Sequence, residues 1–127
     1  MSKEEKEILI KRGKEFQILA ERMFNEGNYN LAAFFIEQSL QFYLKYILFN
    51  TLGYFPRTHS ISRLFSELMR MDDEFKNFFD ENEIIIKSIE DAYILSRYYP
   101  REYSKKEAEE VMKLLLKFID KFKKWIS

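Results

Sequence analysis

The chain has 127 residues, with 21 basic and 21 acidic side chains, and so carries a formal net charge of zero. This length suits one domain with a real core, here residues 1–127, and the balanced charge excludes a global field that would draw the protein onto a polyanion. The absence of cysteine excludes disulfides and thiolate chemistry, and a lone histidine, His59, excludes a His-rich metal site. We therefore predict no metal and no cofactor.

The sequence also bears on where the protein works. No apolar stretch reaches the roughly 18 residues that a membrane span needs, and the charged start of the chain is unlike a signal peptide. We predict a cytoplasmic protein with no membrane partner. High Lys, Glu, Ile and Tyr with few Gln fits a thermophilic source.

The first three predicted elements are helices. The first runs to about Asn25 and ends at Gly27, and the second runs from a cap at Asn28 to Gly53. A shorter third helix follows a cap at Ser60. The segment "DDEFKNFF" after it adds a helical turn or two.

Two further predicted helices flank a proline loop. Asp80, with Glu83 three residues later, predicts the N-cap of the fourth helix, and Pro100 requires that helix to end. "SKKE", from Ser104 to Glu107, is a capping box that opens a fifth, amphipathic helix. Since no segment shows the alternation of a strand, the sequence predicts an all-α, up-and-down bundle of four to five helices in a single domain.

The second and fifth helices carry more apolar residues than one buried stripe needs. The residues that spread over more than half the circumference of the second helix are Phe34, Phe35, Phe42, Tyr43, Tyr46, Ile47 and Phe49. Those outside the main stripe of the fifth are Leu114, Leu116, Phe118 and Trp125. Exposed apolar surface commonly marks a partner site, which favours a homodimer. A deeply central second helix explains the same pattern, and both interpretations stay open.

Two loops combine arginine with aromatic residues: "GYFPRTHS" after the second helix and "YPREYS" after the fourth. Short connections make successive helices antiparallel, which would bring both loops to the same end of the bundle. Arginine forks bind phosphate oxygens and aromatic faces stack on bases, so this end would suit a nucleotide or RNA. The predicted phosphate- or nucleotide-binding residues are Arg57, Arg97, Arg101, Tyr99 and Tyr103.

Taken singly, these residues have simpler explanations. Arg97 suits the C-terminal end of a helix dipole, and Tyr98 and Tyr99 can cover the end of the bundle. His59, beside a helix start, suits a local hydrogen bond. The convergence of the two loops is what favours binding.

The stretch "LAAFFIEQSLQFYLKYILFNTLGYFPRTHSISRLFSEL", followed later by "DAYILSRYYPREYSKKEAEEVMKLLLKFIDKFKKWI", resembles the HEPN family (higher eukaryotes and prokaryotes nucleotide-binding). The order and spacing of these pieces carry the resemblance, from residue 28 to residue 127. The resemblance implies a helical bundle that pairs as a homodimer. It further implies either a metal-independent ribonuclease, often the toxin of a toxin–antitoxin pair, or the accessory partner of a small nucleotidyltransferase.

The nucleases of that family carry an arginine followed, after four to six residues, by a histidine. Arg97 matches the arginine, but the window for the histidine holds Glu102, Tyr103 and Ser104. Acid–base work near neutral pH wants a pKa near 7, which histidine supplies unaided. His59 or Tyr103 would have to replace the missing group.

Three functions therefore stay open. We favour a homodimeric HEPN subunit that binds nucleotide or RNA, or docks on a nucleotidyltransferase, without nuclease activity. The second candidate is an active, divergent ribonuclease in which Arg97 acts with His59 or Tyr103. The third is a helical interaction module whose arginines form internal ion pairs with Glu90 and other carboxylates.

Overall fold

Helices make up almost all of the structure, a computed structural model that describes residues 3–98 and 102–127, without the side chains of residues 95–98. Over these ranges it contains five α-helices and no strand, which confirms the all-α prediction. No helix within the described ranges is both long enough and apolar enough to cross a bilayer. The helices are α1 (Lys3–Asn25), α2 (Tyr29–Leu52), α3 (Ile61–Met69), α4 (Asp73–Tyr98) and α5 (Lys105–Lys121), followed by a 3-10 turn at Lys123–Trp125.

Most helix ends lie where the sequence predicts them. Gly27 and Gly53 have positive φ angles of 79° and 81°, a left-handed conformation that glycine adopts without strain. Asn28 caps α2 through its side chain, and Ser104 and Glu107 form the predicted reciprocal capping box at the start of α5. Local side-chain chemistry therefore fixes these boundaries.

The predicted helix start at Asp80 lies two residues before the point at which the structure has a kink between two helical segments, at Asn82. α4 begins earlier, at Asp73, and passes through this segment with a kink at Asn82 (φ −125°, ψ 17°). Phe75 and Phe78, which precede the expected start, are 0% and 1% exposed. A helix lets both rings enter the core from one face, and this burial outweighs the local cap signal.

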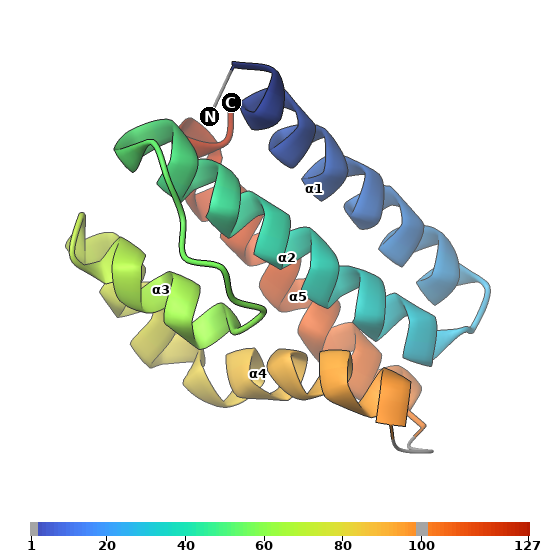
Figure 1. Cartoon of the computed structure of the whole chain (residues 1–127). Helices are drawn as coiled ribbons and strands as arrows, with labels where there is room; N and C mark the ends of the chain where they lie inside the picture. Colours follow the sequence, from blue (N-terminus) through green and yellow to red (C-terminus); the bar gives the residue numbers. More distant parts are fainter. Residues whose placement is uncertain (1–2, 99–101) are drawn as a thin grey trace.

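α2 is the central helix and packs against each of the other four (Figure 1). Tyr43 and Ile47 are fully buried along it, while Phe34, Phe35 and Phe42 are half-buried. The central position of α2 thus accounts for most of its apolar excess within one chain. The homodimer stays a prediction.

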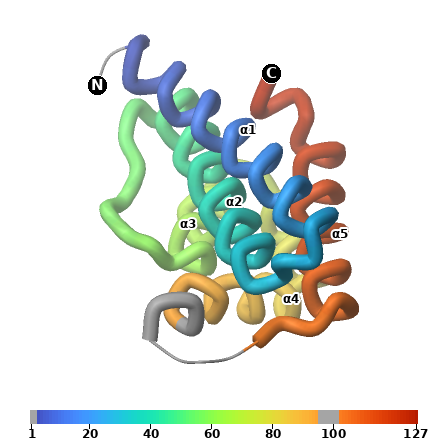
Figure 2. Tube along the Cα trace, turned by 90° about the vertical axis from the view of Figure 1, so that its right-hand side faces the viewer, coloured from blue at the N-terminus to red at the C-terminus, as the bar shows by residue number. Residues whose placement is uncertain are grey.

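The connection between α2 and α3 runs back along the bundle (Figure 1, Figure 2). Lys45 Nζ lies 5.7 Å from the ring centroid of Phe55, and further along the loop His59 stacks on Tyr93 of α4. As a result α3 runs in the same general direction as α2, whereas the sequence led us to expect an antiparallel pair. Tyr54 therefore stays near the C-terminal end of α2, and only the later loop residues reach α4.

The centre of the bundle contains a set of packed phenylalanine rings that we call the inner cluster. Each ring is at most 1% exposed, and neighbouring centroids lie 4.4 to 6.1 Å apart. The rings come from α3, α4 and α5 and tie these helices together. The inner cluster consists of Phe65, Phe75, Phe78, Phe118 and Phe122.

Candidate nucleic-acid interface

A short row of aromatic rings links the loop before α3 to α4 and α2. The imidazole of His59 stacks on Tyr93, with ring centroids 4.9 Å apart and planes within 17°. Tyr93 in turn lies 6.5 Å from Phe34 of α2, with planes within 21°. His59 is exposed, whereas the other two rings are half-buried. We call these three rings the outer row.

Two arginines lie close to His59 along the chain and are exposed. Arg57 precedes it by two residues, and Arg63 lies in the first turn of α3. The Arg63 side chain is 60% exposed and lies 3.8 Å from a Glu67 carboxylate oxygen, a contact that leaves most of its guanidinium in water. We call Arg57, His59 and Arg63, together with Tyr93, the His59 surface.

The structure describes only part of the loop that contains Pro100. The backbone of Arg97 belongs to α4, one turn beyond Tyr93. Tyr99 and Arg101 lie outside the described residues. The structure thus brings His59 to the helix that carries Arg97.

Tyr103 has a different environment from the one the sequence suggests. Its side chain is only 6% exposed and packs with Ala33 and Ala92 in a small apolar cluster. Its backbone N–H donates to Asn30 Oδ1 at 2.6 Å, which ties the segment before α5 to the first turn of α2. A ring packed in this way offers no open face to a base.

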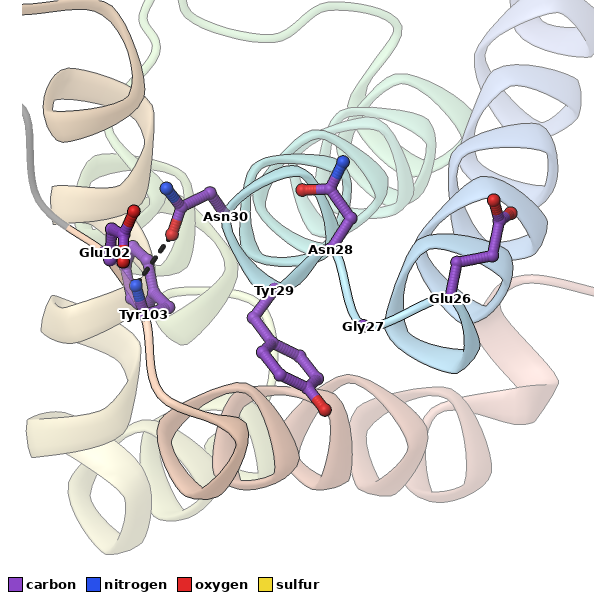
Figure 3. A pocket seen from close by; sticks show the side chains of 7 residues that line it. All are labelled: Glu26, Gly27, Asn28, Tyr29, Asn30, Glu102 and Tyr103. Atoms are coloured by element: carbon purple, nitrogen blue, oxygen red, sulfur yellow. Dashed lines mark hydrogen bonds between the residues drawn. The ribbon is translucent and has the colours of Figure 1, made fainter.

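A polar pocket of about 340 Å³ lies where residues 102–103 meet the turn between α1 and α2 (Figure 3). Glu26 and Glu102 contribute carboxylates to its lining, together with Asn28, Tyr29 and Asn30. Among the residues that the structure describes, the lining has two carboxylates and no arginine, which opposes phosphate binding. The His59 surface is therefore the better candidate for an anionic ligand.

Glu90, on α4 one turn before Tyr93, caps the start of α3. The backbone N–H of Ser62 donates to Glu90 Oε1 at 2.7 Å, and the Ser62 hydroxyl donates to the same oxygen. First-turn amides of a helix have no partner within the helix, so a carboxylate from a neighbouring helix satisfies one of them. These bonds link Glu90 to the start of α3 and so fix Arg63 relative to α4.

Sequence reasoning missed a buried carboxylate, Glu37, in the middle of α2. It is 0% exposed and accepts from Gln38 Nε2 at 2.7 Å and from Gln41 Nε2. Burial raises the pKa of Glu37 to about 7; the two amide donors and Lys45 oppose this rise, and Glu90 adds to it. Burial likewise lowers the pKa of Lys45, and Glu37 opposes that change.

A signal for this feature was present in the sequence. Glu37, Gln41 and Lys45 recur at four-residue spacing on the face that also carries Ala33, and Ala33 is buried. We call Glu37, Gln38, Gln41, Lys45 and Glu90 the polar seam. The pKa of Glu37 would suit acid–base chemistry, but a fully buried carboxylate cannot reach a substrate.

The chain matches the family model of the HEPN domain over residues 6–125. Neither a curated protein nor a solved structure matches the chain. Within the described residues, no group of three His, Cys, Asp or Glu side chains is arranged to hold a metal ion.

Proposed function

The chain belongs to the HEPN domain family, and we propose that it is a homodimeric RNA- or nucleotide-binding protein whose His59 surface contacts phosphate. One observation carries this proposal: the loop before α3 runs back along the bundle and stacks His59 on Tyr93, one turn before Arg97. Arg57 and Arg63 are exposed beside it. Guanidinium groups bind phosphate oxygens bidentately, and exposed rings stack on bases.

We further propose an accessory role, beside a small nucleotidyltransferase, rather than a nuclease role. The family's catalytic arginine has its match in Arg97, but the expected histidine positions hold Glu102, Tyr103 and Ser104. Tyr103 is buried, so it does not supply the missing proton transfer at an open site. The arginine that supports phosphate binding is therefore present, whereas the histidine that catalysis requires is missing from the motif.

One observation favours the second candidate, a divergent metal-independent ribonuclease of the toxin type. His59 is exposed and stacks on the helix that carries Arg97. An imidazole beside an arginine is the pair that cleavage through a 2′-hydroxyl needs. This candidate predicts RNA cleavage without metal, abolished in both Arg97→Ala and His59→Ala.

The third candidate, an interaction module with internally paired arginines, draws less support. Glu90, one of its expected ion-pair partners, bonds Ser62 at the start of α3. Among the described residues, the ion pair that Arg63 forms is the 3.8 Å contact to Glu67, on its own helix. Exposed pairs of this kind contribute little, so Arg63 can engage a phosphate at small cost.

The test is binding and cleavage of a labelled single-stranded RNA in the absence of metal. Arg63→Ala and Arg70→Ala form a matched pair, because each arginine lies 3.8 Å from Glu67 but only Arg63 belongs to the His59 surface. We expect Arg63→Ala to weaken binding several-fold and to lower the slope of log K against log salt by about 0.7. Arg70→Ala should leave both unchanged; equal effects of the two changes would contradict the proposal.

A second measurement distinguishes the accessory role from the nuclease. Intact RNA after incubation with wild type, bound more weakly by Arg97→Ala, supports the accessory role. Cleavage that disappears in Arg97→Ala would establish the nuclease instead. Light scattering on the purified protein tests the homodimer, for which a monomer at micromolar concentration would be the contrary result.

A further inference from the structure

We infer that His59 is a stacking platform for an unpaired base of single-stranded RNA, so that the outer row continues into the ligand. This inference rests on the proposed function and adds a subsite to it. The imidazole already stacks on Tyr93 at 4.9 Å and 17° through one face. His59 is nevertheless exposed, and a ligand would stack on the ring face opposite Tyr93.

The rings behind His59 give the platform support. Tyr93 lies 6.5 Å from Phe34, and Phe34 lies 5.7 Å from Phe35, which contacts Phe16 of α1 at 5.8 Å. The imidazole is therefore backed by a chain of aromatic contacts that reaches across α4, α2 and α1. A ring held in this way is pre-organised for stacking and loses little entropy on binding.

The backbone on both sides of His59 is also held. The Ser60 N–H donates to Thr58 Oγ1 at 3.0 Å, and the Ser60 hydroxyl accepts the N–H of Arg63 at 3.1 Å. Both residues that flank His59 thus use their side chains to fix the turn into α3. Since neither of these bonds involves the imidazole, the local turn leaves the His59 ring available to a ligand.

The charges around the platform identify the occupant. Arg57 and Arg63 lie on either side of His59 in the chain and are exposed, and each carries a guanidinium that can bind phosphate oxygens. A base stacked on His59 with its own phosphates on these arginines satisfies both features. Only an unpaired base offers its face in this way, which selects a single strand over a duplex.

The experiment compares a short oligoadenylate RNA with a length-matched strand whose residues are abasic, so that the two carry the same phosphates. Wild type, His59→Ala and His59→Phe are titrated with both, and stacking is followed by the fluorescence of a 2-aminopurine placed in the base-bearing strand. We expect wild type to bind the base-bearing strand about tenfold to a hundredfold more tightly and to quench its fluorescence. His59→Phe should keep this preference, and His59→Ala should lose it, so that this variant binds the two strands with similar affinity.

The outcomes separate this inference from the proposed function. If His59→Ala keeps the preference for bases, or if wild type has none, the platform is wrong, whereas weaker binding by Arg63→Ala still supports the phosphate surface. If wild type binds neither strand, both proposals fall. Loss of the preference in His59→Phe as well as in His59→Ala would also overturn the inference, because a phenyl ring stacks as an imidazole does.

Discussion

The inner cluster and the outer row are both built from aromatic rings, yet their geometries differ. In the inner cluster, ring planes meet at angles from 10° to 88°, because neighbours surround each ring on all sides. In the outer row, the planes of neighbouring rings are within 21° of each other, and the contacts run from α2 through α4 to the loop. A cluster packed in all directions stabilises the fold, whereas a row with an exposed end leaves a ring face for a ligand.

The largest effect should come from truncating a ring of the inner cluster. Phe78 is 1% exposed and contacts Phe65, Phe118 and Phe122 at centroid distances of 5.5 to 6.1 Å. We expect Phe78→Ala to lower the free energy of unfolding by about 3–5 kcal/mol, since it removes buried apolar surface and leaves a cavity. Urea unfolding followed by circular dichroism measures this loss.

The matched control for this change is Tyr93→Ala in the outer row. Tyr93 is half-buried, so the expected loss is about 1–2 kcal/mol. Equal losses at Phe78 and Tyr93 would mean that the outer row is part of the core after all. A comparison of Phe78 with Tyr93 could then no longer distinguish rings that stabilise the fold from rings that serve binding.

The polar seam, which lies next to the outer row, should make stability depend on pH. The pKa of Glu37 is raised from 4.5 to about 7 in the folded chain. The folded state therefore holds this proton more tightly, and the contribution to stability is fully present below pH 4.5 and is lost as pH rises through 7. At about 1.4 kcal/mol per pKa unit, the free energy of unfolding should fall by about 3 kcal/mol across this range.

Glu37→Gln removes this titration while keeping the size of the side chain. Unfolding is measured in urea at several pH values, and the wild-type curve minus the variant curve isolates the contribution of Glu37. That difference should fall between pH 4.5 and pH 8, with Lys45 and Glu90 as the charged groups that modulate it. A difference that stays constant over this range would contradict the buried position of the carboxylate.

A smaller loss is expected where the polar seam caps α3. Glu90→Ala leaves the Ser62 N–H without its carboxylate and should lower the free energy of unfolding by about 1–2 kcal/mol. Asp91→Ala is the control, because Asp91 is the exposed neighbour on the same helix and its removal should stay within about 0.5 kcal/mol. Hydrogen exchange in the first turn of α3 should rise only in Glu90→Ala.

The sequence predicted those parts of the fold that local chemistry determines. Gly27, Gly53, Ser60 and the capping box at Ser104 each mark a helix end, because a left-handed residue or a capping oxygen acts within a few residues of itself. The predicted helix start at Asp80 was misplaced for the same reason, because a cap-like local pattern carries no information about the burial of the rings that precede it.

The path of the loop before α3 could not be predicted in this way. It depends on contacts between residues distant in the chain, such as His59 with Tyr93 and Ser62 with Glu90. His59 and Arg57 were recognisable as candidates by residue type, but the stacking of His59 was not. Glu37 was recognisable only through its spacing with other polar residues on a buried face.

Among the changes to aromatic rings, His59→Ala should have the smallest effect on stability, and this sets the outer row apart from the inner cluster. His59 is exposed, and the stack on Tyr93 is its one ring contact among the described residues, so His59→Ala should cost about 0.5–1 kcal/mol of unfolding free energy. The same change should weaken RNA binding about tenfold or more, whereas Phe78→Ala should affect binding only through the loss of folded protein. Stability is measured by urea unfolding, and RNA binding is measured under conditions in which each variant is fully folded. If His59→Ala destabilised the protein as strongly as Phe78→Ala, His59 would be a structural element of the fold. Its stacking on Tyr93 would then no longer support a ligand site.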